Sequence, residues 1–162
     1  MILTVTLNPS IDTSYQIDHL HIDDVNRVMP HRTAGGKGLN VSRVLTQLDD
    51  EVLATGFIGG HLGEALADLM DADGIPHSFT PIAGETRICI AVLHEGNQTE
   101  FLEHGPEISA NELESFLNHF ADLAATEDCG AVTLSGSLPA GVPADVYAGM
   151  VARPARHLGS RP

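Results

Sequence analysis

Gly35-Gly36-Lys37-Gly38-Leu39-Asn40 is the stretch that decides the fold of this chain, and it contains the only lysine in the sequence. Apolar residues recur at helical spacing from Gly38 to Leu48, which predicts a glycine-rich turn that leads into a helix. Such a turn lets the backbone adopt positive φ angles and approach a ligand closely. The helix behind it presents free N–H groups and the positive end of its dipole, which suits a phosphate group or sugar oxygens.

The glycine stretch does not match two well-known nucleotide-binding patterns. Gly38 stands where a P-loop needs Ser or Thr to coordinate magnesium, and the spacing of the dinucleotide fingerprint fails at Val41. A tight turn with a purely structural role is the alternative interpretation. We favour ligand binding, because the only lysine of the chain falls inside the turn.

The net charge argues against several classes of partner. With 22 acidic residues, 8 Lys and Arg residues and a formal net charge of −14, the protein repels nucleic-acid backbones and anionic membranes. The acidity fits either adaptation to a salty cytosol, where the Debye length shrinks to about 3 Å at 1 M salt, or an ordinary acidic cytosolic protein. In either case, a cation inside a pocket becomes conspicuous.

Three further features predict a cytoplasmic protein. The N-terminus lacks a basic region followed by an apolar stretch, so we expect no signal peptide. No apolar run is long enough to span a membrane. Cys89 and Cys129 lack metal-type spacing and are expected to be reduced residues of the core.

Strands and helices alternate along much of the chain. Strands are expected at 2–7, 52–58 and 131–134, and helices at 38–48, 63–70, 109–125 and from Pro143 onward. This alternation predicts an α/β fold with a parallel sheet and helices on both faces. Segments 11–33 and 86–104 contain only strands, so they are expected to form a separate small sheet that closes over a ligand as a lid.

Polar residues that suit a sugar phosphate lie near the ends of these strands. Asp12 follows the first strand, and a carboxylate there can accept hydrogen bonds from two sugar hydroxyls, although a strand-ending Asx turn is the alternative. Arg27 and Arg87 fall in the small sheet, where guanidinium groups bind phosphate as a fork, although surface ion pairs are the alternative. His19 and His21 lack a third ligand, so we expect no metal site.

These motifs together resemble the ribokinase/phosphofructokinase-B family of carbohydrate kinases, in particular its 1-phosphofructokinase and tagatose-6-phosphate kinase branch. The resemblance covers residues 1 to about 152. It depends on Thr6-Leu7-Asn8-Pro9 with Asp12, Gly35 to Arg43, Gly59-Gly60 with Gly63, Thr86-Arg87, and Ser135-Gly136-Ser137-Leu138-Pro139. One departure is Asp49, where the family has Gly or Ser at the end of the helix.

The resemblance implies a ribokinase-like α/β core with a β-sheet lid, and a reaction that moves the γ-phosphoryl group of Mg-ATP to a primary hydroxyl of fructose 1-phosphate or a related ketose phosphate. The residues that would hold the ketose phosphate are Asp12, Gly36, Lys37, Asn40 and Arg87, with Arg27 as a weaker candidate.

The resemblance also implies what this sequence lacks. Chains of the family are about twice as long, and their second half carries the nucleotide site, the magnesium-organising residues and a catalytic Asp in a glycine-rich anion hole. No Gly-Ala-Gly-Asp-like motif occurs in this sequence. Residues 153–162 contain three Arg and no acidic residue, unlike the rest of the chain. We therefore expect a truncated kinase chain over 1–152 with a non-family tail at 153–162 that is poorly ordered.

Two consequences are expected of such a chain. It would have no catalytic residue and would not bind ATP and Mg²⁺ productively. It would also form a homodimer, either through the lid or through an exposed sheet edge. The alternatives to a kinase half are a non-catalytic sugar-phosphate-binding or dimerisation module, and an unrelated α/β binding domain whose glycine loop is only a turn.

Overall fold

The computed structural model of the chain describes residues 1–152. The predicted tail at 153–162 lies outside the described residues. In chain order the elements are β1 (Ile2–Thr6), β2 (Ser10–Ile17), β3 (Pro30–Gly35), α1 (Lys37–Gln47), β4 (Val52–Gly59), α2 (Gly60–Ala72), β5 (Thr80–Ile82), β6 (Arg87–His94), β7 (Asn97–Leu102), α3 (Ala110–Ala124), β8 (Ala131–Leu134) and α4 (Val146–Ala152).

A central sheet of parallel strands, in the order β5-β4-β1-β8, forms the body of the protein. β1 lies between β4 and β8, with Ile2 opposite Val52 on one side and Ala131 on the other. From Leu3 to Thr6 the strand is buried, because it has neighbours along both edges and helices over both faces. The residues that follow β1 emerge at the carboxyl edge of the sheet, where open α/β proteins bind their ligands.

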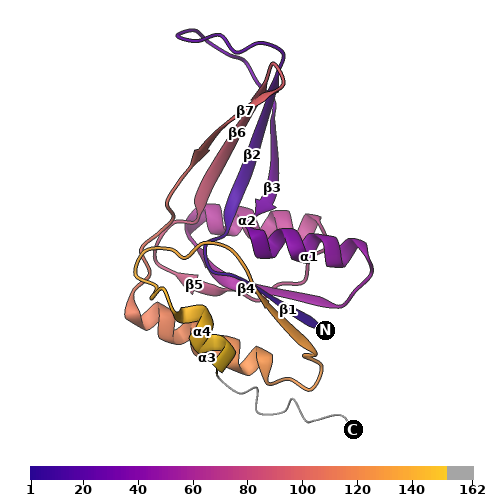
Figure 1. Ribbon diagram of the computed structural model, residues 1–162, viewed down its shortest axis with the longest axis vertical. Coiled ribbons are helices and arrows are strands. Elements are labelled where there is room, and N and C mark those ends of the chain that lie inside the picture. Colours follow the sequence, from indigo (N-terminus) through magenta and orange to yellow (C-terminus); the bar gives the residue numbers. More distant parts are fainter. Residues whose placement is uncertain (153–162) are drawn as a thin grey trace.

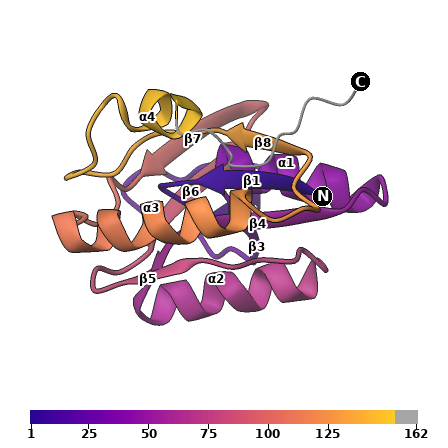
Figure 2. The same cartoon turned by 90° about the horizontal axis from the view of Figure 1, so that it is seen from below.

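Two apolar clusters attach a pair of helices to each face of the central sheet. Phe116 of α3 and Met150 of α4 share a buried cluster with Val5 of β1. On the opposite face, Leu39 of α1 and Leu66 of α2 belong to a second buried cluster. Figure 1 shows α1 and α2 on one side of the central strands and α3 and α4 on the other, and Figure 2 shows α3 lying across β1 and β4.

The second sheet, in the order β3-β2-β6-β7, extends away from the central sheet (Figure 1). β2 pairs antiparallel with β3 and parallel with β6, and β6 and β7 form an antiparallel hairpin. The register places Asp12, Cys89 and Leu102 in one row across three strands. Glu100 lies two residues from Leu102, so it shares the same face of the sheet.

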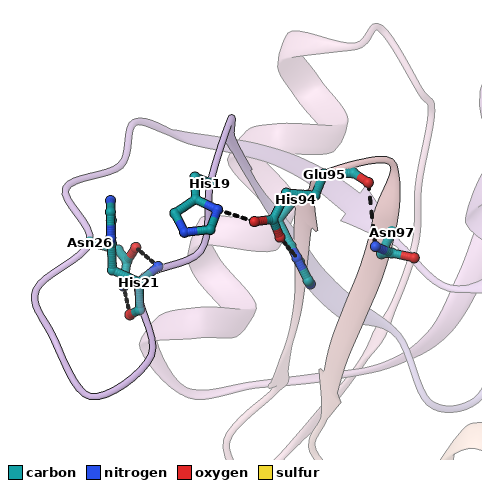
Figure 3. Close-up of polar contacts among 6 residues, drawn as sticks. All are labelled: His19, His21, Asn26, His94, Glu95 and Asn97. Carbon is teal, nitrogen blue, oxygen red and sulfur yellow. Dashed lines mark hydrogen bonds and ion pairs between the residues drawn. The ribbon is translucent and has the colours of Figure 1, made fainter.

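Figure 3 shows the far end of the second sheet, where loop 18–29 meets the turn between β6 and β7. His19 contacts one carboxylate oxygen of Glu95, and the other lies 2.9 Å from Nδ1 of His94. The pKa of Glu95 is lowered, first by the hydrogen bond with His94 and further by His19. These contacts tie the loop to the hairpin.

The parallel sheet, the helices on both faces and the separate small sheet confirm the expected fold class. Both cysteines are free and buried, as predicted. In the described part of the chain, no helix has the length and apolar character needed to cross a membrane.

Three details of the fold differ from the expectation. β5 is a three-residue strand that no sequence pattern indicated, and its proline is tolerated because the strand lies at the edge of the sheet. Within segment 11–33, which was expected to contain only strands, residues 18–29 form a loop, and the second strand begins only at Pro30. α4 begins at Val146 rather than at Pro143. The carbonyl of Pro143 accepts a hydrogen bond of 3.0 Å from the N–H of Val146, which closes a turn just before the helix.

Candidate functional site

A pocket of about 490 Å³ lies between the carboxyl edge of the central sheet and one face of the second sheet. Its lining comes from the end of β1, the start of α1, the segment after β8, and strands β2, β3, β6 and β7. Five of the six predicted site residues line it: Asp12, Gly36, Lys37, Asn40 and Arg87. The fold thus brings together residues from three separate parts of the sequence.

The glycine loop forms the part of the pocket next to α1. Gly36 is the N-cap of α1, with φ of 112°, and no side chain within residues 1–152 caps the helix. The first N–H groups of α1 therefore keep their hydrogen-bonding capacity and their positive partial charge for a ligand. Lys37 adds a full positive charge at the first helical position, where a cation opposes the helix dipole, so helix stability does not explain a lysine there.

The three glycines of the loop serve different purposes. Of the three, only Gly36 has a positive φ. Gly35 allows close approach, because a Cβ there would lie 2.1 Å from Cγ of Asp12. At Gly38, a Cβ would lie 2.2 Å from Oγ1 of Thr6, so this glycine lets α1 pack directly on β1.

Asp12 places a carboxylate beside the glycine loop. Its Oδ1 accepts a hydrogen bond of 2.6 Å from the hydroxyl of Ser10. Within residues 1–152, no lysine or arginine forms an ion pair with this carboxylate. It therefore keeps acceptor capacity for the hydroxyl groups of a ligand.

Arg87 is the second cation of the pocket, and backbone carbonyls hold it. Nε and Nη2 donate to the carbonyl of Asn8 at 3.3 and 3.0 Å, and Nη1 donates to the carbonyl of Glu103 at 2.8 Å. Carbonyl groups fix the guanidinium without neutralising its charge. Across the described ranges, neither Arg87 nor Lys37 forms an ion pair with a carboxylate. The pocket thus has a positive region in a protein of net charge −14.

Asn40 lies one helical turn after the glycine loop, and Arg43 orients its side chain. Nη1 of Arg43 donates to Oδ1 of Asn40 at 2.9 Å, and Nε of Arg43 is anchored on Asp73 at 3.1 Å. This hydrogen bond to the oxygen fixes the orientation of the Asn40 amide, and the NH₂ group on its other side stays available as a donor for a ligand.

Other residues of the pocket were not assigned to the site from the sequence. Gly136 and Ser137 follow β8 and line the pocket, although they were named from the sequence only as part of the family resemblance. Gln98 and Glu100 of β7 also line it. The alternation within β7 shows that these two share a face, but no local signal tells which face meets the ligand.

One predicted residue is not brought to the pocket. Arg27 lies exposed in loop 18–29, at the far end of the second sheet, and is not among the lining residues. The rings of His19 and His21 pack edge to face with centroids 4.9 Å apart. Residues 1–152 contain no group of three or more His, Cys, Asp or Glu side chains that could hold a metal ion.

Comparison with known proteins gives a consistent result. The model of the pfkB family of carbohydrate kinases matches residues 6–156. Among solved structures, a candidate phosphofructokinase from Staphylococcus aureus is 37% identical with a TM-score of 0.80, and the match covers 93% of this chain and 48% of that one. A candidate 1-phosphofructokinase from Thermotoga maritima is 31% identical with a TM-score of 0.87, over 93% and 49% of the two chains.

A third similar structure contains a bound sugar phosphate. Phosphofructokinase-2 from Escherichia coli in complex with fructose-6-phosphate is 27% identical, with a TM-score of 0.82, and the match covers 93% of this chain and 50% of that one. The same enzyme has also been solved in a tetrameric inhibited form. This chain therefore spans about half the length of the solved structures that it matches.

Proposed function

Because this chain belongs to the pfkB family of carbohydrate kinases, we propose that it supplies the substrate-binding half of a sugar-phosphate kinase. The proposed reaction transfers the γ-phosphoryl group of ATP to a primary hydroxyl of fructose 1-phosphate or a related ketose phosphate, which yields a bisphosphate. In this proposal, residues 1–152 form the family part of the chain and the second sheet acts as a lid. The cytoplasmic location stays a prediction from the sequence.

One observation carries this proposal. Lys37 and Arg87, two cations that form no ion pair with a carboxylate of residues 1–152, converge with the carboxylate of Asp12 on one pocket at the N-terminus of α1. Cations and free helix N–H groups suit a phosphate, whereas a carboxylate suits neutral hydroxyls. A ligand that carries both kinds of group, such as a sugar phosphate, satisfies all of them at once.

The residues of this chain would bind and orient the acceptor. Arg87 and Lys37 would neutralise its phosphate, Asp12 would accept hydrogen bonds from its hydroxyls, and the NH₂ group of Asn40 would donate to a sugar oxygen. Fixing one hydroxyl of a flexible sugar reduces the entropic cost of reaching the reactive geometry. Ser137 also lines this pocket and offers a hydroxyl donor.

ATP with Mg²⁺ would supply the transferred phosphoryl group. We assign no metal ligand and no catalytic base to this chain, because residues 1–152 contain no cluster suited to a metal ion and the sequence has no Gly-Ala-Gly-Asp-like motif. Loss of a general base costs about 10²–10⁴ in rate, and loss of charge-stabilising donors costs about 10²–10³ more. This chain alone is therefore expected to bind a ketose phosphate weakly and to transfer no phosphoryl group.

Two measurements on the purified chain test this proposal. Calorimetric titration with fructose 1-phosphate, fructose 6-phosphate and tagatose 6-phosphate should show weak binding of at least one of them. The Asp12→Ala variant should weaken that binding, whereas Asp68→Ala, which removes the same charge from an exposed position on α2, should not. A coupled assay for ADP release should stay at background.

Two outcomes would contradict the proposal in different ways. If no ketose phosphate binds, the pocket is not a sugar-phosphate site. Turnover near 1 s⁻¹, within the usual kinase range, that disappears in Asp12→Ala would show that the chain is a complete enzyme. Binding without turnover is expected both of a kinase half and of a non-catalytic sugar-phosphate-binding module. To separate these two, the chain is mixed with the separately expressed C-terminal half of a family member. Phosphoryl transfer by the mixture would favour the kinase half.

We also propose that the chain associates with itself. Exposed apolar side chains lie in loop 18–29 (Ile22, Val25 and Met29) and on β7 (Phe101), and β8 forms an edge of the central sheet within residues 1–152. Exposed edges and apolar patches favour association. Light scattering at micromolar concentration should show a dimer or larger. If the chains associate through the lid, Met29→Ser should weaken the dimer. If they associate through the sheet edge, Val132→Lys should weaken it. A monodisperse monomer of the unmodified chain would refute both modes of association.

A further inference from the structure

Asn8, just after β1, is a buried polar residue with contacts to three segments of the chain. Its side chain is almost fully buried. Nδ2 donates to the carbonyl of His104 at 3.2 Å and lies 3.3 Å from Oγ of Ser137, to which it also donates. The backbone carbonyl of Asn8 accepts the two hydrogen bonds from Arg87. One residue therefore links the segment before α3, the segment after β8 and the arginine of the pocket.

Hydrogen bonds join Asn8 and Arg87 to the same short segment of the chain, residues 103–105. Arg87 is held between the carbonyl of Asn8 and that of Glu103, and the next residue, His104, is held by the side chain of Asn8. The segment 103–105 passes so close that a Cβ at Gly105 would lie 2.3 Å from Oδ1 of Asn8. A shift of the Asn8 side chain would therefore move both this segment and Ser137.

Stability alone does not explain an amide at this position. Oδ1 of Asn8 is buried and accepts no hydrogen bond from residues 1–152. Burial of an unpaired polar atom is destabilising, and an apolar side chain of similar size would avoid that cost. The amide is instead explained by its NH₂ group, which supplies two donors to two different segments of the pocket wall.

We propose that Asn8 is a positioning residue that fixes Arg87 and Ser137 relative to each other, so that both groups contact the phosphate of the substrate. This inference rests on the proposed function, because it assumes that the pocket binds a ketose phosphate. Asn8 need not contact the ligand itself. It acts through the two hydrogen bonds of its NH₂ group and through the backbone carbonyl that holds the guanidinium.

A double-mutant cycle tests whether Asn8 acts through Ser137. Affinity for the best-bound ketose phosphate is measured by titration for Asn8→Ala, Ser137→Ala and the double variant. Loss of one hydrogen bond corresponds to about tenfold in affinity, and we expect a loss of that order for Asn8→Ala. The double variant should lose clearly less than the product of the two single losses. A residue that only stabilises the fold would give independent losses.

A second pair of variants covers the case in which Asn8→Ala does not fold. Gly105→Ala adds a Cβ that displaces the Asn8 side chain, and it should weaken ketose-phosphate binding several-fold. Gly96→Ala is its matched control, because Gly96 has a similar positive φ (77°, against 89° at Gly105) and no atom lies within 4 Å of the added Cβ. Gly96→Ala should bind with unchanged affinity. The side-chain NH₂ resonances of Asn8 should shift in Gly105→Ala but not in Gly96→Ala. They report on Asn8 itself, whereas Cδ of Arg87 would lie only 3.4 Å from the added Cβ.

The outcomes separate this inference from the proposed function. If the unmodified chain binds a ketose phosphate and folded Asn8→Ala and Gly105→Ala bind it equally well, Asn8 has no positioning role and the proposed function stands. Additive losses in the cycle would also overturn the inference. If the unmodified chain binds none of the ketose phosphates, the proposed function fails and this inference fails with it.

Discussion

The two ends of the second sheet are built differently, although the same strands form both. Where β2 and β6 leave the central sheet, Ser10 is buried and Arg87 is held by backbone carbonyls. At the far end, His19 and His94 each contact Glu95 near the surface (Figure 3). Apolar side chains of loop 18–29 are also exposed there. The near end therefore has the rigidity that a binding site needs. The far end has contacts that depend on pH and salt, and it offers apolar surface.

The largest expected difference concerns packing, and it contrasts α1, which lies beside the near end and packs on β1, with the turn at the far end. Gly38→Ala should lower the free energy of unfolding by about 3 kcal/mol, because the added Cβ would lie 2.7 Å from the backbone oxygen of Val5, which cannot move aside. Gly96→Ala at the far end should cost about 1 kcal/mol, from its left-handed backbone alone. Urea denaturation measures both, and equal costs would contradict the comparison.

The next difference concerns the two arginines. Arg87→Ala should reduce affinity for a ketose phosphate on the order of 10- to 100-fold, because it removes a charged, forked donor from the pocket. Arg27→Ala at the far end should change affinity by less than about twofold, a change too small to attribute to a lost hydrogen bond. Titration calorimetry compares them. A loss of tenfold or more in Arg27→Ala would show that this side chain reaches a ligand.

A smaller effect is expected for the capping box that starts α3, in the body of the protein. The carboxylate of Glu112 accepts hydrogen bonds from Ser109 Oγ (2.6 Å), Ser109 N–H (2.8 Å) and Ala83 N–H (2.7 Å). These bonds lower the pKa of Glu112, the one from the Ser109 hydroxyl most. Ser109→Ala should cost about 1 kcal/mol of stability at neutral pH, measured by urea denaturation.

The lowered pKa of Glu112 also fixes the direction of its pH dependence. The stabilisation from its ionised form is fully present above the ordinary pKa of 4.5 and is lost as pH falls through the lowered pKa of the folded state. Stability of the unmodified chain should therefore fall more steeply below about pH 4.5 than that of Glu112→Gln. Parallel curves would refute this role of Glu112.

The smallest expected effect is a difference in salt sensitivity between two carboxylates. Glu95 has a lowered pKa because of its contacts with His94 and His19, two side chains that can carry positive charge, whereas the partners of Glu112 are neutral. At 1 M salt, where the Debye length is about 3 Å, the pKa of Glu95 should move back toward its ordinary value more than that of Glu112. Carbon-13 NMR titration of the carboxyl groups measures both. Equal shifts would show that charge on the histidines does not contribute.

Most of the fold could be predicted from the sequence because its signals are local. Apolar periodicity placed α1, and the capping box at Ser109 and Glu112 placed the start of α3. β5 escaped prediction because three residues at a sheet edge carry no periodic pattern. The glycine loop was located by its composition, yet the separate purposes of its glycines depend on the strands that pack against it.

The sequence by itself therefore determined the order of the elements other than β5, the family resemblance and five residues of the pocket lining. Only the tertiary structure decided which face of the second sheet meets the pocket, and that Arg27 lies away from it. It also revealed Asn8, whose side-chain partners His104 and Ser137 lie 96 and 129 residues along the chain. Hydrogen bonds of this kind are set by how distant segments pack, and a sequence pattern records only neighbours within a few residues.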